Sequence, residues 1–306
     1  MKIFIIVLII IAVIIFAAPY LLFHFIFSKP KRSKKVPKYY VDTPHYKVSR
    51  AGMAFMETIP CEDVYITSRD GLKLHAYLYP AEGNTNKFVL GIHGYKSYAR
   101  PEFGPYIKFY RSLGYSMLCP DDRAHGPSEG EYIGFGVLDR LDCVDWAKYL
   151  VERFGDDVEI RLHGVSMGGA TVLAASGEED LPEQVKGIVA DCGYCSAEEI
   201  LKFEMKEMMH LPSDYLIPRI EKICQKRAGF NFHEHTPIEQ VKKAKVPILI
   251  VHGEKDPMVP SYMAEKIYSA CGSEKQLMVV PEAAHAESIA FAPEEYYKNI
   301  HEFFGI

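Results

Sequence analysis

A serine between two glycines carries the first chemical signal in this chain of 306 residues. The stretch Gly164-Val165-Ser166-Met167-Gly168 lies between an expected strand at residues 158–162 and an expected helix at residues 169–175. Such a turn strains the serine backbone and lifts its hydroxyl clear of the sheet, and the residues two before and two after it must lack a Cβ. The pattern predicts that Ser166 is a nucleophile. The alternative is a glycine-rich turn with a structural serine.

A serine hydroxyl attacks a carbonyl only when a base takes its proton and a carboxylate orients that base. His285 follows an expected strand at residues 276–280, and Asp256 follows another at residues 247–251. Because the carboxyl ends of parallel strands share one edge of a sheet, we expect both side chains to reach Ser166. Asp191, at the end of an earlier strand, and Glu254, in the same loop as Asp256, are alternative acids.

The backbone N–H groups of Tyr95 and Met167 are the expected oxyanion hole. Tyr95 follows His93-Gly94 at the end of the first buried parallel strand, and Met167 directly follows the nucleophile. Donors placed in this way typically lower the barrier by about 2.7 to 4 kcal/mol each. We expect His93 to order the loop rather than to react.

These residues are positioned by alternating strands and helices, which predict a mostly parallel sheet of eight strands with helices on both faces. A hairpin at residues 64–79 comes first. The strand before the turn at residues 164–168, which we call the nucleophile elbow, carries Glu159, Arg161 and His163. A central strand should instead be apolar on both faces. Either these side chains pair beneath the helices or that face is partly open.

One segment of about 50 residues breaks the alternation, because it contains no expected strand. It predicts a helical lid over the site at residues 197–245. Its apolar side chains would suit either an acyl chain or plain helix packing.

Together these motifs resemble the α/β-hydrolase superfamily, in the branch of lipases, esterases and serine aminopeptidases. The block at residues 121–130 is similar to the Asp-x-Arg-Gly-His-Gly-x-Ser loop of that branch, with Ala124 where glycine is usual. The resemblance is to membrane-anchored bacterial hydrolases of unassigned substrate. It implies the α/β-hydrolase fold for a domain at residues 51–306 and hydrolytic chemistry.

The first 28 residues predict a membrane anchor. Residues 3–27 are apolar except for Pro19, Tyr20 and His24, and about 20 apolar residues suffice to cross a bilayer. A cleaved signal peptide is the alternative interpretation. Six Lys and Arg between residues 29 and 38 predict a basic linker, residues 29–50, and a cytoplasmic catalytic domain. This linker could lie on anionic headgroups or be simply solvated.

Charge and cysteine usage exclude other classes of function. Removing the seven Lys and Arg of residues 1–38 leaves 28 basic against 40 acidic residues, which makes nucleic acid a poor partner. The seven scattered cysteines do not predict a disulfide framework, and Cys192 and Cys195 have redox-motif spacing without a thioredoxin-like setting. We expect no metal and no organic cofactor.

The predicted function is a membrane-tethered serine hydrolase that cleaves carboxylic esters or thioesters of apolar acyl groups through an acyl-enzyme. Its expected partners are a small-molecule acyl ester and the membrane. A serine aminopeptidase-like peptidase and an acyltransferase are alternatives on the same fold. A catalytically inactive, membrane-tethered binding module is the alternative from another class.

Overall fold

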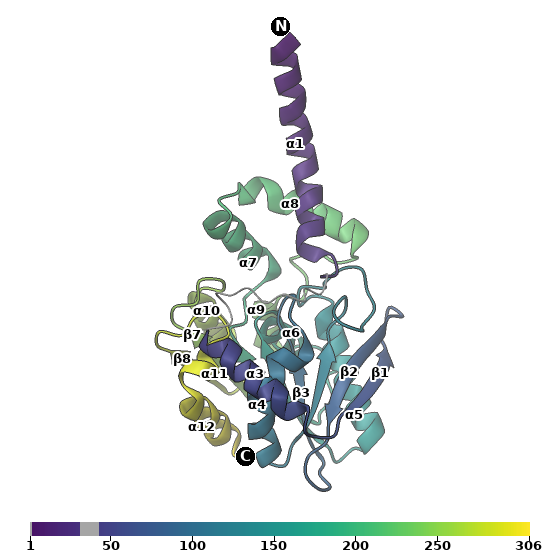
Figure 1. Ribbon diagram of the computed structural model, residues 1–306, viewed down its shortest axis with the longest axis vertical. Coiled ribbons are helices and arrows are strands. Elements are labelled where there is room, and N and C mark those ends of the chain that lie inside the picture. The colour runs from purple at the N-terminus through teal and green to yellow at the C-terminus, as the bar shows by residue number, and fades with distance from the viewer. Residues whose placement is uncertain (1, 31–42) are drawn as a thin grey trace.

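A computed structural model describes residues 2–30 and 43–306, with only the backbone described for residues 2–14. Eight strands form one sheet in the order β1-β2-β4-β3-β5-β6-β7-β8 (Figure 1). Strands β3 to β8 pair in parallel, whereas β2 is antiparallel to both of its neighbours, β1 and β4. The strands are β1 Glu62–Thr67, β2 Lys73–Tyr79, β3 Lys87–Ile92, β4 Ser116–Asp121, β5 Glu159–Val165, β6 Val185–Asp191, β7 Ile248–Gly253 and β8 Lys275–Val280. The predicted eight-stranded, mostly parallel sheet is confirmed.

Helices cover both faces of this sheet, and its central parallel strands are accordingly buried on both sides. Buried side chains of α5 (Asp139–Phe154), α6 (Met167–Ala175) and α10 (Tyr262–Ala270) belong to one hydrophobic core. Those of α4 (Ala99–Ser112) and α12 (Pro293–Phe304) belong to the other. The short elements are α9 Pro237–Gln240, the 3-10 turn η2 Val241–Lys243 and α11 Ser288–Phe291.

The chain reverses its direction of travel across the sheet at β3. From β3 it passes to β4 on one side and then returns to β5 on the other, so the loops after β3 and β5 diverge. Ligands of open α/β sheets bind in the crevice that such a switch point creates. The expected oxyanion loop follows β3 and the serine follows β5, so the topology brings them together.

The charged side chains of β5 pair beneath the helices. Arg161 forms an ion pair with Glu159 at 2.7 Å, and Tyr115 donates a hydrogen bond to the same carboxylate. His163 lies between the hydroxyls of Tyr110 and Tyr296, 3.0 and 3.1 Å away. Burial lowers the pKa of His163 to about 3, which keeps the imidazole neutral. The first of the two interpretations of this strand is therefore confirmed.

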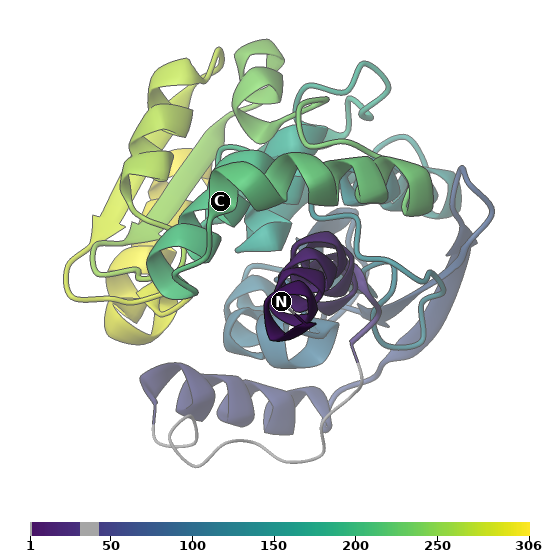
Figure 2. The same ribbon diagram turned by 90° about the horizontal axis from the view of Figure 1, so that it is seen from above.

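The insertion between β6 and β7 is helical, as predicted. It contains α7 (Ala197–Phe203), the π-helical turn η1 (Glu204–Met208) and α8 (Ser213–Arg227). In Figure 2, which views the molecule along α1, α7 and α8 lie across the face from which α1 projects.

Helix α3, Pro44–Met56, packs on α4 through two glycines. A Cβ on Gly52 would collide with the backbone of Gly104, which shows how closely the two helices cross. The expected boundary between a linker and the hydrolase domain, at residues 50 and 51, falls inside this helix. Residues 31–42 of the expected linker, which include five of the six Lys and Arg between residues 29 and 38, lie outside the described residues.

Helix α1, Lys2–Phe27, ends within the hydrolase domain. Phe23 and Phe27 are fully buried in the core, where Phe27 contacts Phe135 and stacks on Phe232. Lys29 continues the attachment, donating from its side chain to the carbonyl of Ser128 at 2.6 Å. Among the residues that the structure describes, no helix combines the length and apolar character needed to span a bilayer.

Candidate active site

The turn from β5 into α6 holds Ser166 in a conformation that few residues adopt. Ser166 has φ 57° and ψ −117°, in a region that costs a side-chain-bearing residue about 1–3 kcal/mol. A Cβ on Gly164 would strike the backbone of Gly168, and a Cβ on Gly168 would strike the carbonyl of Ile92. Both glycines are therefore required by the close approach of backbone segments.

Ser166, His285 and Asp256 form one chain of hydrogen bonds. Ser166 Oγ lies 2.8 Å from His285 Nε2, and His285 Nδ1 lies 2.7 Å from Asp256 Oδ2. The carboxylate can only accept, so Nδ1 carries the proton and Nε2 accepts from the serine hydroxyl. The three residues that the sequence placed at separate strand ends thus meet, in an arrangement that can take a proton from Ser166.

Asp256 is held by its own loop. Its Oδ1 accepts hydrogen bonds from the backbone N–H of Met258 at 2.8 Å and of Val259 at 2.9 Å. His252 supports the same loop by donating from Nε2 to the carbonyl of Val259 at 2.7 Å. With Oδ1 fixed in this way, Oδ2 is left to face His285.

The two alternative acids lie elsewhere. Glu254 is exposed, and His285 bonds Asp256 instead. Asp191 is fully buried at the end of β6, and neither of its carboxylate oxygens has a hydrogen-bond partner among the described residues. Burial raises the pKa of Asp191 to about 7, although the nearby Tyr296 hydroxyl and His285 act in the opposite direction. Its backbone carbonyl accepts from the Ser166 N–H at 2.8 Å, so Asp191 supports the elbow through its main chain.

The environment of His285 favours its protonated form. Burial alone would lower the pKa of the imidazole, but the hydrogen bond and the charge of Asp256 outweigh it, with smaller effects of Glu102 and Asp191. The pKa of His285 is therefore raised above its ordinary value of 6.5. An imidazole with a raised pKa is a stronger base, and it gains support for the positive charge that it takes on in the reaction.

The two expected oxyanion donors flank the nucleophile. Met167 is the first residue of α6, so its N–H has no acceptor within the helix. Gly94 lies against the elbow, because a Cβ on Gly94 would come within 3.2 Å of the Ser166 Cβ. Tyr95 follows Gly94 and lines the same cavity as Ser166.

The block at residues 121–130 braces this loop from beneath. The backbone N–H of Asp122 donates to His93 Nε2 at 3.0 Å, and the N–H of Lys96 donates to His125 Nε2 at 3.1 Å. Arg123 is buried between carboxylates, with its Nε 2.6 Å from Asp142. These contacts support the expectation that His93 orders the loop.

Ala124 occupies the position in this block where the resembled family has glycine. Its φ is 60°, in the left-handed region that glycine adopts at lower cost. Its N–H donates to the carbonyl of Glu129 at 2.8 Å, so the turn forms in spite of the Cβ.

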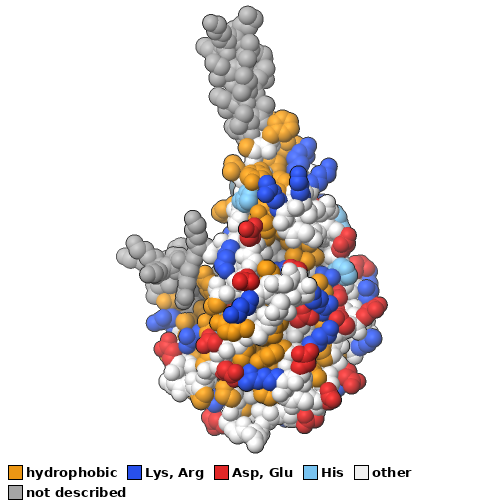
Figure 3. Space-filling view, turned by 90° about the vertical axis from the view of Figure 1, so that its right-hand side faces the viewer, with side chains coloured by type: hydrophobic (Ala, Val, Ile, Leu, Met, Phe, Trp, Pro, Cys, Tyr) orange, Lys and Arg blue, Asp and Glu red, His pale blue; other side chains and the backbone are white. Residues whose placement is uncertain are grey.

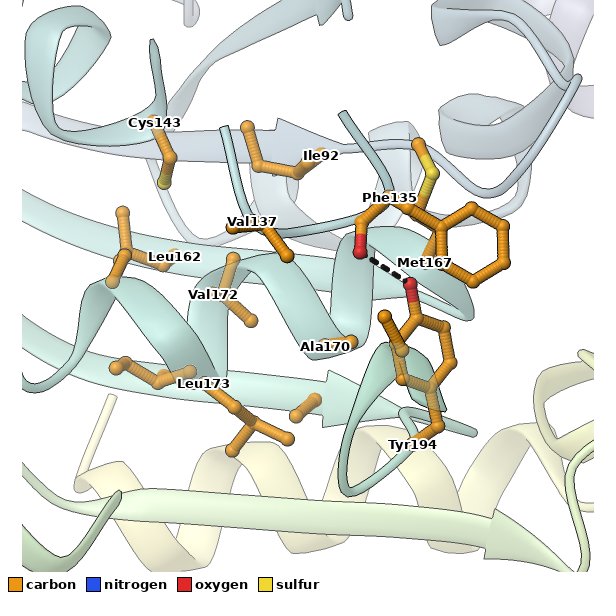
Figure 4. Close-up of a cluster of buried hydrophobic side chains, with 14 of the residues drawn as sticks. Ile92, Phe135, Val137, Cys143, Leu162, Met167, Ala170, Val172, Leu173 and Tyr194 are labelled. Atoms are coloured by element: carbon orange, nitrogen blue, oxygen red, sulfur yellow. Dashed lines mark hydrogen bonds between the residues drawn. The ribbon is translucent and has the colours of Figure 1, made fainter. Parts of the chain in front are cut away.

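A cavity of about 280 Å³ opens beside Ser166 and His285. Its apolar lining comes from several elements: Phe135, Tyr194, Ile200, Met258, Val259 and Ala286. Figure 4 shows Phe135, Tyr194 and Met167 grouped at one end of the core around α6, with the Tyr194 hydroxyl donating to the Phe135 carbonyl at 2.9 Å.

The cavity also has residues that the sequence did not single out. Glu204 of the lid lines it, and burial raises the pKa of this carboxyl to about 6. Glu102 lines it too and accepts from the N–H of Gly94. His45 is contributed by α3, a helix that the Thr43-Pro44 start signal could have predicted. The π-helical turn that places Glu204 has no sequence signal of comparable strength.

One group of potential metal ligands lies close together within the described part of the chain. Ligand atoms of Cys192, Asp256 and His285 are all within 4.8 Å of one another. The imidazole in this group already bonds the carboxylate through Nδ1 and Ser166 through Nε2. Cys192 and Cys195 are buried free thiols, and burial raises the pKa of both, which disfavours the reactive thiolate.

Comparison with known proteins agrees with this geometry. The chain is 27% identical over 198 residues to the uncharacterised protein YqkD of Bacillus subtilis, and the match covers 65% of each chain, just under two thirds of the relative. It is also 27% identical over 284 residues to the human serine hydrolase BPHL, which covers 85% of this chain and 92% of BPHL. The solved structure of the Pyrococcus furiosus esterase Pf2001 superposes with a TM-score of 0.67 at 22% identity, covering 91% of this chain and 96% of that one.

These similarities confirm the α/β-hydrolase fold and a hydrolase family with esterase and peptidase relatives. A sequence model of the prolyl oligopeptidase family matches residues 135–305, more than half of the chain, including Ser166, Asp256 and His285. The chain belongs to the prolyl oligopeptidase family.

Proposed function

We propose that this protein is a serine hydrolase that cleaves carboxylic esters or thioesters of apolar acyl groups through an acyl-enzyme. Ser166 Oγ attacks the acyl carbonyl while His285 Nε2 takes its proton. The N–H groups of Tyr95 and Met167 bind the oxyanion of the tetrahedral intermediate. His285 then protonates the leaving alcohol or thiol as the bond to the acyl carbon breaks.

Water completes the cycle by the same steps. His285 takes a proton from a water molecule while the water oxygen attacks the acyl carbon. His285 then returns a proton to Ser166 Oγ as the bond between Oγ and the acyl carbon breaks and the acid leaves. Asp256 holds the imidazole with Nδ1 protonated and stabilises the imidazolium in both halves. The observation that carries the proposal is the position of His285, 2.8 Å from the serine and 2.7 Å from the carboxylate at the rim of one cavity.

The lining of the cavity supports an apolar acyl group. Phe135, Tyr194, Ile200, Met258 and Val259 offer hydrocarbon surface next to the nucleophile, and burying such surface contributes about 25 cal/mol for each Å². Peptidase and acyltransferase activities would use the same three residues, because the acyl-enzyme can be formed from an amide or released by an alcohol. The pocket therefore decides between these reactions.

A substrate panel tests the proposal. Purified protein is assayed with p-nitrophenyl esters of increasing acyl length, matched thioesters and aminoacyl p-nitroanilides, with Ser166→Ala as the blank. We expect the highest kcat/KM on esters or thioesters of apolar acyl groups. Preferred cleavage of the anilides would favour a peptidase, and acyl transfer to an added alcohol in place of hydrolysis would favour an acyltransferase. A folded protein without any turnover would favour a binding module.

We also propose that the N-terminal segment tethers the enzyme to the cell membrane, with the catalytic domain on the cytoplasmic side. The apolar run at residues 3–27 and the Lys and Arg that follow it support this proposal. Carbonate extraction of membranes tests the tether. Release of the protein by carbonate would contradict the proposal. The orientation is tested with a reporter fused to the carboxyl terminus. If such a reporter showed activity only on the far side of the membrane from the cytoplasm, the proposed orientation would be wrong.

A further inference from the structure

Helix α8 presents a row of cations on its outer side. Leu216, Ile217, Ile220 and Cys224 are buried on its inner side, as expected for an amphipathic helix that packs on the domain. Four basic side chains, Arg219, Lys222, Lys226 and Arg227, are exposed on the remaining surface. We call these four residues the basic face of α8.

These cations have no acidic partner among the residues that the structure describes. Arg219 stacks on the ring of Tyr215 and donates to its carbonyl, and none of the four forms an ion pair with a carboxylate of the described residues. The chain from residue 39 onward is acidic even with these four cations counted, with 28 Lys and Arg against 40 Asp and Glu. An uncompensated basic helix on an acidic domain is suited to an anionic partner.

Helix α8, which carries the basic face, packs against α1, and α1 has exposed apolar side chains. Phe16, Leu21 and Phe25 are 80%, 65% and 66% exposed. The two helices pack together, and the Tyr215 hydroxyl of α8 donates to the carbonyl of Ile15 at 3.4 Å. Figure 3 shows Lys and Arg side chains gathered beside the apolar residues of α1 at this end of the molecule.

The tip of the lid adds to the same surface. Met208 and Met209, at the end of η1, are 49% and 40% exposed. In Figure 2, α8 lies across the view while α1 is seen end-on, so the outer side of the lid and the projecting helix face the same way. A flat anionic surface with an apolar interior could meet both sets of side chains at once.

We propose that the basic face of α8 docks on the anionic headgroups of a lipid bilayer, while the exposed apolar residues of α1 and the lid tip enter its interfacial layer. Cations beside an apolar stripe bind such interfaces through charge attraction and burial of apolar surface together. The lid residues Ile200 and Glu204 line the cavity at Ser166, so docking would place the substrate cavity close to the bilayer. The bilayer would then be the source of the substrate.

Hydrogen exchange on the full-length protein tests this proposal. The protein is bound to vesicles of phosphatidylcholine, with or without one third phosphatidylglycerol, and exchange is measured in the peptides that cover Ser213–Arg227. Each cation near an anionic surface strengthens binding by about fivefold, so we expect exchange in α8 to slow by at least about tenfold with phosphatidylglycerol. The protection should fade in 1 M salt, where the Debye length falls to about 3 Å.

A pair of charge-reversal variants provides the control. Lys222→Glu with Lys226→Glu reverses two exposed cations one turn apart on the basic face, and we expect it to abolish the protection. Lys186→Glu with Lys298→Glu reverses two exposed cations outside the lid and should leave the protection intact. Ester turnover in detergent should be unchanged in both double variants, because neither pair contacts the cavity.

Three outcomes would overturn the proposal. One is equal protection of α8 on neutral and anionic vesicles, and another is equal loss of protection in both double variants. The third is full protection of α8 by duplex DNA without lipid, which would indicate a general polyanion site. A protein that binds the vesicles but lacks esterase activity would contradict the proposed chemistry and leave the docking surface standing.

Discussion

The hydroxyl of Tyr95 donates a hydrogen bond of 2.7 Å to the carbonyl oxygen of Ile26. This bond joins the loop of the proposed oxyanion hole to the last turn of α1. Lys96, the next residue of the loop, donates to the neighbouring carbonyl of Phe25, also at 2.7 Å. The end of α1 is therefore attached to the active-site loop through two side chains, in addition to the buried contacts of Phe23 and Phe27.

Tyr95→Phe should loosen α1 and leave the chemistry nearly unchanged. The loss of one hydrogen bond costs about 1 kcal/mol, and amides in residues 15–27 should exchange faster. Because the backbone N–H at position 95 remains, kcat should change by less than about threefold. Tyr297→Phe is the matched control, since that hydroxyl donates to the carbonyl of Pro105 and not to α1. A large fall in kcat for Tyr95→Phe would assign the hydroxyl a direct role.

Asp256→Asn should cut kcat severely in a protein that stays folded. The amide oxygen can still accept from Met258 and Val259, which leaves the NH₂ group facing His285 Nδ1. The imidazole would then carry its proton on Nε2 and could not accept from Ser166, a loss of about 10⁴-fold in kcat. Asp191→Asn is the comparison, and it should retain most activity. A harsher effect of Asp191→Asn, with normal thermal unfolding, would make Asp191 the acid.

The pH profile should report the raised pKa of His285. His285 must be neutral to accept a proton from Ser166, so activity falls as the pH drops through its pKa. Since that pKa is raised above 6.5, half of the maximal kcat/KM should be reached above pH 6.5. Residual turnover of Asp256→Asn should show this midpoint at lower pH, because the group that raises the pKa is gone while burial remains. A midpoint that moves upward would contradict the assignment.

The backbone strain at Ser166 should be measurable as a difference in the free energy of unfolding between two variants. At φ 57° a Cβ is unfavourable, so Ser166→Gly should be more stable than Ser166→Ala by about 1 kcal/mol in urea unfolding. Ser176, at the end of α6, has an ordinary φ of −59°. There the order should reverse, with Ser176→Ala more stable than Ser176→Gly by about 0.5–1 kcal/mol. If Ser166→Ala were as stable as Ser166→Gly or more stable, the backbone at Ser166 would not be strained.

The sheet was predictable because most of its parallel strands are short apolar runs, and the site because Ser166, Asp256 and His285 lie in the turn or loops that follow β5, β7 and β8. The glycines at positions 164 and 168 indicated that backbone segments approach closely around Ser166, because only glycine fits at these two positions. By contrast, the amino-acid sequence of β5 does not indicate that His163 lies between Tyr110 and Tyr296, which belong to two different helices. Such pairs depend on long-range packing.

The N-terminal region shows more clearly what the sequence alone does not predict. An apolar run as long as residues 3–27 indicates a helix, but its periodicity does not distinguish Phe16, which is 80% exposed, from Phe27, which is fully buried. That difference arises from the aromatic partners that surround Phe27, including Phe135, Phe230 and Phe232. Glu204 is a similar case, because its place in the cavity depends on one π-helical turn within the lid.

Covalent labelling identifies the nucleophile of this protein. Full-length protein is treated with a fluorophosphonate, and the modified peptide is identified by mass spectrometry in the wild type, Ser166→Ala and His285→Ala. We predict one modified site, at Ser166, with no labelling in Ser166→Ala and labelling slowed by at least about 10³-fold in His285→Ala. A folded wild-type protein that is not labelled, or is labelled at another serine, would contradict the account.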